Sequence, residues 1–445
     1  MQTFFLFALI ILSVVAMVIA ISKFQMHPFI VMTVIAVLVG LIWGIDPEQV
    51  VTTVKEGFGS ILTSIGIVIL CGTIIGTILE KTGAAITMAN FILKIVGKNN
   101  SVVAMGIMGY VTGIPVFCDS GFVVLSPISR ALAAQSNVSL AVTATALSGG
   151  LYATHCLVPP TPGPIAMAGT LEADLGLTIL VGLVVSIPAV LVTILYALKV
   201  SSKVQIPANS KYTLEELEAK YGKLPNPLHS FSPLLLPIIL IALASVAAFP
   251  NYPFGEGIVY KFIVFIGNPV IALLLGVFLA MTLIPESEKK NTLSWVTEGV
   301  TSSAAIMAIT GAGGSFGAIL KLLPIADATT GLLASGLGVF IPFIIAMILK
   351  LAMGASTVAM ITTASMMAPL MANMGFTSPI ARVLIVLAIG AGSMVASHAN
   401  DSYFWVVSQF SDMDTKQAYR CQTGMTAVMG FTVVIILFII SLFVV

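Results

Sequence analysis

Long apolar runs, separated by short polar breaks, follow one another along almost the whole chain. A transmembrane helix needs about 20 apolar residues, and the runs provide about 11–13 such helices together with several shorter ones. The clearest runs span residues 1–21, 28–43, 61–79 and 177–198, whereas 84–96 is too short for a full crossing. The pattern predicts an all-α, polytopic membrane protein.

The one long polar segment spans residues 201–232, near the middle of the chain. Within it, the run from Thr213 to Tyr221 begins with a capping-box pattern, which predicts a short helix. The lysines of the segment place it on the cytoplasmic side of the membrane. We interpret it as a connector between a first membrane repeat, residues 1–200, and a second, residues 233–445.

Four short motifs recur in the same order in the two halves of the chain. They are His27-Pro28 and Asn268-Pro269, Glu56-Gly57 and Glu298-Gly299, the Gly-x-x-x-Gly motifs that begin at Gly72 and Gly313, and Gly149 to His155 with Gly392 to His398, at separations of 241, 242, 241 and 243 positions. The nearly constant separation predicts an internal duplication, which in transporters places the substrate near the midplane between the copies. The loop before Glu298 carries Lys289 and Lys290, whereas the matching loop has only Lys55, and this difference favours inverted copies.

Composition excludes several classes of protein. Of the 445 residues, 58% are hydrophobic and only 8% are charged, whereas soluble domains carry roughly 25% charged residues. The net charge of +1 gives no indication of nucleic-acid binding. The four cysteines match neither a metal site nor a redox pair, and no Walker motif or nucleophile elbow occurs. We therefore expect the lipid bilayer as the surroundings, with no cofactor, no metal and no catalytic residue.

The stretch from Phe117 to Pro164 places polar residues inside an otherwise apolar region. Asp119 stands between apolar segments, where desolvation disfavours the charged carboxylate and suits the group to carrying a proton. Gly121, close behind it, fits a helix break or a re-entrant tip. The alternative is that Asp119 is a loop residue between two spans.

The same stretch ends in a proline cluster through which no regular helix continues. Thr154 and His155 stand shortly before this cluster, which runs from Pro159 to Pro164 and includes Thr161. A broken helix presents free carbonyl groups and a helix N-terminus to a cavity, and the N-terminus favours an anion. His155 is suited to titrate with a coupled proton, or it is a structural histidine that donates to a carbonyl.

The second half offers polar residues at the corresponding places. Ser397-His398-Ala399-Asn400-Asp401 supplies a histidine, an amide and a second acid. Gly354 to Val358 supplies hydroxyls where the first half has Asp119, although packing of small residues between helices is the alternative there. Lys350 either pairs with an acid, holds a substrate carboxylate or reaches to the membrane surface. Arg130 and Arg382 are interpreted as interfacial.

These motifs together resemble those of the gluconate:proton symporter (GntP) family. The similarity rests on Phe117 to Val123, Thr154-His155 with Val158 to Pro164, Gly354 to Ala359 and Ser397 to Asp401, and it extends along essentially the whole chain. The resemblance implies the inverted repeats, re-entrant hairpins and dimeric scaffold of the ion-transporter superfamily. It also implies proton-linked import of gluconate and related sugar acids, or of D-serine in one branch.

Two departures from the family pattern lie at the predicted site. The pattern has a glutamate where this chain has Asp119, and His-Pro-Gly-Pro where this chain has Thr161 to Pro164. Both changes leave the substrate open.

The sequence and this resemblance predict a secondary active symporter of the bacterial inner membrane that couples proton entry to uptake of a small hydroxy-carboxylate such as gluconate. The resemblance also implies a homodimer. Proton coupling is assigned to Asp119 and His155. The predicted substrate-binding residues are Ser120, Gly121, Thr154, Pro159, Thr161, Ser356, Thr357, His398, Asn400 and Asp401. The alternatives are a sodium-coupled transporter of a carboxylate or of a D-amino acid such as D-serine, and a membrane-embedded enzyme that uses Asp119 and His155.

Overall fold

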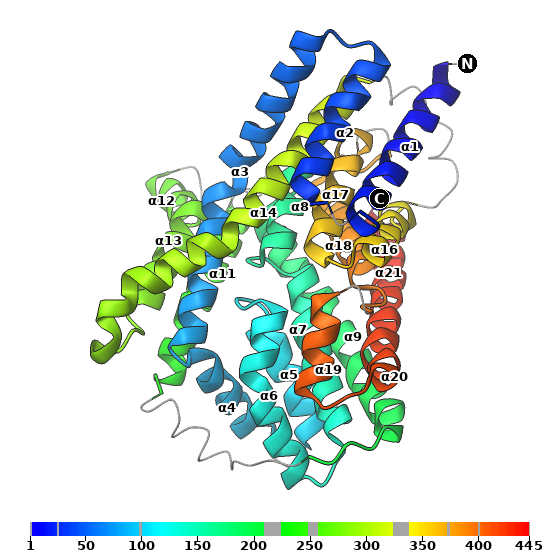
Figure 1. Cartoon of the computed structure of the whole chain (residues 1–445). Coiled ribbons are helices and arrows are strands. Elements are labelled where there is room, and N and C mark those ends of the chain that lie inside the picture. The colour runs from blue at the N-terminus through cyan, green and yellow to red at the C-terminus, as the bar shows by residue number, and fades with distance from the viewer. Residues whose placement is uncertain are drawn as a thin grey trace.

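Helices make up the regular structure of the chain. The computed structural model describes residues 2–24, 26–97, 100–208, 224–247, 257–323, 338–371, 374–398 and 401–444, and every regular element within these ranges is helical (Figure 1). The predicted all-α class is confirmed. The short helix predicted over Thr213 to Tyr221 lies outside the described residues, as does Asn400.

The helices fall into two groups along the chain, before residue 204 and after residue 226, so η2 and the start of α11 lie within the predicted connector, 201–232. The first group comprises α1 (Gln2–Ser22), α2 (Pro28–Trp43), α3 (Pro47–Lys81), α4 (Ala84–Val96), α5 (Ser101–Thr112), α6 (Cys118–Gln135), α7 (Leu140–Leu157), α8 (Pro162–Thr170), α9 (Leu175–Lys199) and the short η2 (Ser201–Lys203). The second comprises α11 (Pro227–Ala247), α12 (Ile258–Ile266), α13 (Pro269–Met281), η3 (Glu286–Asn291), α14 (Thr292–Lys321), α16 (Phe340–Met353), α17 (Ser356–Met367), η5 (Ala368–Leu370), α18 (Pro379–Met394), α19 (Ser402–Phe410), α20 (Thr415–Ala418), the π-helical η6 (Tyr419–Thr423) and α21 (Gly424–Val444).

Several helices begin with the same local device, a capping side chain followed by proline. The device is present at the starts of α2, α3, α13 and α18, where the capping residues are His27, Asp46, Asn268 and Ser378. Asp46, for example, accepts the backbone N–H of Glu48 at 3.0 Å. Proline suits this position because its missing N–H would have no partner there, and its fixed φ is already helical. The predicted bounds of α2 and α4 agree with the observed ones.

Helix length separates full spans from shorter apolar helices. Four segments are long and apolar enough to cross a membrane: Leu175–Lys203, Pro227–Ala244, Glu286–Lys321 and Thr415–Val444. Two bent pairs, within α3 and from α12 to α13, also qualify if each is taken as one span. Among the described helices this gives fewer continuous spans than the predicted 11–13, because six further apolar helices have only 10–17 residues.

Two large hydrophobic cores join most of these helices, and a small third cluster of Ile179, Ile241 and Ala272 joins α9, α11 and α13. The larger core unites α4–α9 with α16–α21, and the second unites α1–α3 with α13 and α14 and with the parts of α8 and α17 that face them. Helices α3 and α14 pack along one another beside the larger core (Figure 1). Helix α7 lies within the larger core, where every one of its residues is buried.

The element order after α4 repeats after α14. A pair of helices, α5–α6 or α16–α17, precedes a longer helix that breaks and continues as a nine-residue helix, α8 or α19. The turns that follow contain Glu172 and Asp412, both with left-handed φ, and two residues later Asp174 and Asp414 cap the next helix. This order agrees with an internal duplication. Inverted orientation, re-entrant hairpins and the division at 201–232 stay predictions.

Candidate functional site

Four breaks between short helices lie near one another inside the protein. They are residues 113–117 between α5 and α6, 158–161 between α7 and α8, 354–355 between α16 and α17, and the described residues 395–398 and 401 between α18 and α19. Helix α3 approaches two of them closely, since a Cβ added at Gly76 would lie 2.6 Å from the Pro115 carbonyl oxygen and one at Gly72 would lie 2.9 Å from that of Pro160. Only glycine permits this approach. Helix α3 therefore closes one side of the region where the four breaks meet, which we call the junction.

A buried ion pair connects the two breaks of the second half. The Nζ of Lys350 lies 2.5 Å from Oδ2 of Asp401, and their side chains are only 0% and 6% exposed. Lys350 also donates to the carbonyl oxygen of Gly354, at the end of its own helix. The carboxylate of Asp401 also accepts hydrogen bonds from the hydroxyl of Ser397 at 2.5 Å and from the backbone N–H of Tyr403 at 3.1 Å.

This pair decides between the interpretations of Lys350. The prediction that it pairs with an acid is confirmed, and the alternative that it reaches to the membrane surface is wrong, because the side chain is fully buried. Two buried charges need each other, since removing one partner leaves the other uncompensated at a cost of about 3–5 kcal/mol. Asp401 is therefore a neutralised acid.

Asp119 lies in the first turn of α6, and its surroundings differ from those of Asp401. Among the described residues, its Oδ2 accepts a hydrogen bond only from the thiol of Cys118, with Sγ at 3.9 Å. Its buried Oδ1 has no hydrogen-bond partner among these residues. Asp119 nevertheless lies close enough to Asp401 and Lys350 to interact with both electrostatically. A buried carboxyl oxygen without a partner is costly, unless a proton or a ligand reaches it.

Aromatic rings line the junction next to the two acids. The ring of His155 stacks on that of Tyr152, with centroids 6.2 Å apart and planes 8° apart, and Phe117 lies on another side at 6.3 Å. Tyr152 in turn contacts Tyr403 at 5.2 Å between centroids. The Nδ1 atom of His155 is buried and, among the described residues, has no hydrogen-bond partner. His155 and Asp119 thus each bring an unsatisfied polar atom to the same region.

The predicted residues of the α7–α8 break are all buried, but their hydroxyls serve the backbone. Thr154 donates weakly to the Gly150 and Leu151 carbonyls of its own helix, at 3.4 and 3.3 Å. Thr161 donates to the carbonyls of Val158 at 2.7 Å and His155 at 3.1 Å, which holds the turn that contains Pro159 and its cis bond to Pro160.

The remaining predicted residues divide between the junction and its edges. Ser356 begins α17 and lies within hydrogen-bonding reach of the Tyr152 hydroxyl, with half-buried Thr357 beside it. Ser120 lies close enough to the carboxylate of Glu80 on α3 to interact with it. The imidazole of His398 bonds the Leu351 carbonyl at 3.1 Å on a more exposed side, so the structure does not bring it into the buried cluster. Gly121 packs against the side chain of Leu151.

Sequence reasoning missed several residues of the junction. Tyr152 and Tyr403 stand in apolar runs that read as ordinary packing, and Glu80 follows a span end. Gln422, on the π-helix η6, is fully buried. Its Oε1 accepts a hydrogen bond from the hydroxyl of Ser148 at 2.6 Å, and its Nε2 has no hydrogen-bond partner among the described residues. A glutamine inside the last apolar segment was the signal available in the sequence. The structure adds that it lies on a π-helical turn, and such turns often accompany functional sites.

Sequence comparison assigns the chain to a family. A sequence model described as GntP family permease matches residues 5–443. The chain belongs to the GntP family of permeases. It is 30% identical over 442 residues to the gluconate permease of Pseudomonas aeruginosa, covering 97% of this chain and 96% of the relative. It is also 32% identical over 425 residues to the D-serine transporter DsdX of Escherichia coli K12, covering 94% of each chain.

Comparison of folds shows a transporter of similar architecture. The permease is similar to the crystal structure of the YdaH transporter of Alcanivorax borkumensis, with a TM-score of 0.68 and 12% identity over 94% of this chain and 99% of that one. The predicted family and the multi-pass localisation in the inner membrane are confirmed. The family and the relatives compared with this chain are permeases, so the chain functions as a permease.

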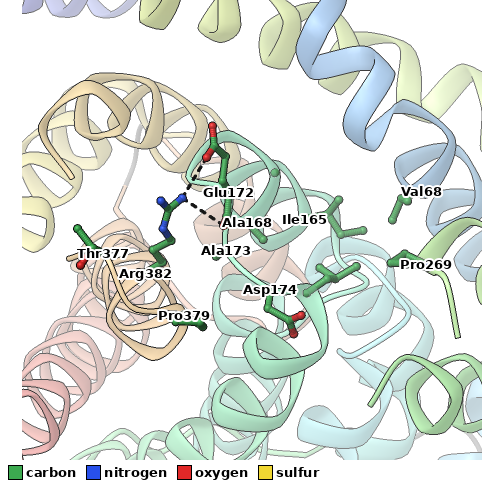
Figure 2. Close-up of a pocket in the computed structure, with 12 residues that line it drawn as sticks. Val68, Ile165, Ala168, Glu172, Ala173, Asp174, Pro269, Thr377, Pro379 and Arg382 are labelled. Carbon is green, nitrogen blue, oxygen red and sulfur yellow. Dashed lines mark hydrogen bonds and ion pairs between the residues drawn. The ribbon is translucent and has the colours of Figure 1, made fainter. Parts of the chain in front are cut away.

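A cavity of about 550 Å³ lies outside the buried cluster, between α3, the turn after α8, the start of α13 and the start of α18. Figure 2 shows Arg382 and Glu172 on one side of it and Val68 and Pro269 on the other. Arg382 bonds the Glu172 carboxylate at 3.1 Å and the Leu171 carbonyl at 3.1 Å. Among the predicted substrate-binding residues that the structure describes, none lines this cavity.

Proposed function

We propose that this permease is a proton-coupled secondary active importer of a small hydroxy-carboxylate such as gluconate or a related sugar acid. The observation that carries the proposal is a difference between the interaction partners of two neighbouring buried acids. Asp401 is neutralised by Lys350, whereas Oδ1 of Asp119 is buried with no partner in the described part of the chain. An acid in this state is suited to gain and lose a proton during each transport cycle. His155, with its own unpartnered nitrogen, is the second candidate for that proton.

Uncapped helix starts support a carboxylate as the substrate. Helices α6, α8 and α17 begin at the breaks described above, and the capping residues Phe117, Thr161 and Ala355 make no side-chain cap. The free backbone N–H groups at such starts bind anions, but α8 offers fewer of them because Pro162 and Pro164 in its first turn have no N–H. Hydroxyls of Ser356 and Thr357 stand at the start of α17 for the polar groups of the substrate. The name of the Pseudomonas aeruginosa relative, a gluconate permease, agrees with this chemistry.

D-serine is the second candidate substrate, because the DsdX relative is named a D-serine transporter. D-serine also carries a carboxylate and a hydroxyl, but it adds an ammonium group. Asp119 would hold that ammonium, and coupling would then fall to His155 or to a sodium ion. The two candidates therefore predict different roles for one side chain.

Reconstitution distinguishes these possibilities. Purified permease in proteoliposomes is supplied with labelled gluconate or D-serine under a proton gradient, a sodium gradient or neither. We expect gluconate or a related aldonate to accumulate under the proton gradient and a proton uncoupler to abolish the accumulation. Accumulation that follows sodium and ignores the uncoupler would overturn the proposal.

We further propose that the permease is a homodimer in the membrane. The support is the resemblance to a superfamily with dimeric scaffolds. The mass of the detergent-solubilised protein, measured by light scattering after size exclusion, is expected to correspond to two chains. A mass of one chain that persists in lipid nanodiscs contradicts the dimer.

A further inference from the structure

The ammonium group of Lys350 occupies a place that oxygen atoms surround. Its Nζ lies 2.5 Å from Oδ2 of Asp401 and also donates to the carbonyl of Gly354, while Oγ of Ser397 bonds the same carboxylate oxygen at 2.5 Å. A backbone carbonyl at a helix end, a carboxylate and a hydroxyl are the oxygen ligands with which broken helices of transporters bind sodium ions. Here a side chain of the protein supplies the positive charge.

The backbone at Gly354 directs its carbonyl to this place. Gly354 follows the last residue of α16 and has φ 80° and ψ −38°, a conformation that side-chain-bearing residues rarely adopt. Its N–H still closes the helix by bonding the Lys350 carbonyl at 2.9 Å. The C-terminal end of a helix carries partial negative charge, so the position attracts a cation in addition to the attraction of Asp401.

In the first half, the helix end at the matching position has neither the cation nor the left-handed glycine, since Gly113 has φ −71° and ψ −12°. Helix α5 ends before Gly113, whose N–H bonds the Gly109 carbonyl at 2.8 Å, and both residues stand 241 positions before Gly354 and Lys350. Gly109 has no side chain to place there. In that half the acid is Asp119, and its Oδ1 has no hydrogen-bond partner within the described ranges.

We propose that the Lys350 ammonium is a built-in cation, which permanently occupies the position of a bound sodium ion in the second half of the permease. The second half then needs no metal ion, and Asp119 in the first half is left as the site for the transported cation. The second statement rests on the proposed function; the first does not. Removing the ammonium while keeping Asp401, Ser397 and the Gly354 carbonyl is expected to create a sodium site.

The test measures sodium binding in the absence of any substrate. Full-length permease and the variants Lys350→Ala, Asp401→Asn and Lys350→Ala/Asp401→Asn are purified in detergent. Their melting temperatures are compared in sodium, potassium and choline chloride at equal ionic strength, and binding of radioactive sodium is measured alongside. The double variant is the matched control, because it removes the cation and the carboxylate together.

We expect sodium to leave wild type unchanged and to raise the melting temperature of Lys350→Ala by about 2–4 °C or more over choline. The double variant is expected to show no selective effect of sodium. The inference is overturned if Lys350→Ala folds but responds equally to all three salts, or if it is unfolded in sodium and potassium alike. Sodium binding by wild type that is lost in Asp401→Asn would contradict the occupied site directly. Since no outcome depends on transport, failure of the proposed substrate or of proton coupling in proteoliposomes is scored separately.

Discussion

Oδ2 of Asp401 accepts hydrogen bonds from both Lys350 and Ser397, each at 2.5 Å, and this one oxygen links helix α16 to the break that follows α18. Because the contact is buried, each partner depends on the others for its polar satisfaction. The consequences for stability can be measured separately from transport.

Removing either charge of this pair is expected to destabilise the permease strongly. Lys350→Met and Asp401→Asn should each lower the unfolding free energy by about 3–5 kcal/mol, because each leaves one buried charge or its polar partners uncompensated. The double variant should recover much of that loss. Thermal unfolding in detergent measures the cycle. Lys289→Met, which breaks the exposed Lys289–Glu286 pair, is the control and should change stability by less than about 1 kcal/mol. Additive losses in the double variant would contradict a coupled pair.

Replacing Asp119 is expected to uncouple transport from the proton gradient. Asp119→Asn keeps the size of the side chain but cannot exchange a proton, so uphill uptake should be lost while exchange of labelled for unlabelled substrate continues. Asp119→Glu keeps the acid and should retain coupled uptake, in keeping with the glutamate of the family pattern. Both are measured in proteoliposomes over a range of pH. Uptake by Asp119→Asn with unaltered dependence on pH removes Asp119 from the coupling role.

The hydroxyl of Thr161 is expected to hold the proline turn. Thr161→Val removes a hydroxyl whose single proton is shared between two buried carbonyls, so the unfolding free energy should fall by about 1 kcal/mol. Thr161→Ser keeps the hydroxyl and serves as the control. If both variants bind substrate poorly while remaining as stable as wild type, Thr161 contacts the substrate and its role is not structural.

The two residues of the ion pair beside the cavity in Figure 2, Glu172 and Arg382, are expected to contribute unequally to the free energy of unfolding. Glu172 is 70% exposed at its side chain, so Glu172→Ala should cost less than about 1 kcal/mol. Arg382→Ala should cost more, because it also removes the bond to the Leu171 carbonyl and the packing of the arginine stem. Thermal unfolding of the two variants provides the comparison. Equal losses would show that the carboxylate contact alone accounts for the effect.

Local signals in the sequence were sufficient for much of the fold. Helix α2 follows from an apolar run with a capping residue and a proline at its start, and α4 from a short apolar run between polar breaks. The start of α3 was missed because its first turns are half polar: the helix begins at Pro47 under the Asp46 cap, well before the apolar run at 61–79. An apolar run marks the part of a helix that lipid or protein covers, not the whole helix.

The candidate site was predictable only in part. Asp119, Thr154 and Asp401 stood out as polar residues in apolar surroundings. The partner of Asp401 lies 51 positions away, and the contact between Tyr152 and Tyr403 joins different halves of the chain. Such pairings arise from tertiary packing, which one sequence without relatives does not contain. The structure was also needed to show that the Thr161 hydroxyl bonds nearby backbone carbonyls. From the sequence alone, a threonine among prolines is equally compatible with binding a ligand.

The complete burial of α7 has a consequence for how the protein is made. This helix touches segments of the second half along its length: Ser148 bonds Gln422, and Tyr403 donates to the Ser148 carbonyl at 3.0 Å. During synthesis α7 leaves the ribosome long before α18, α19 and α21 exist. Its threonines, serine and paired glycines must therefore wait in a lipid or translocon environment until the rest of the chain arrives. The N-terminal half is consequently an unfinished folding unit, and assembly of the site is coupled to completion of the polypeptide.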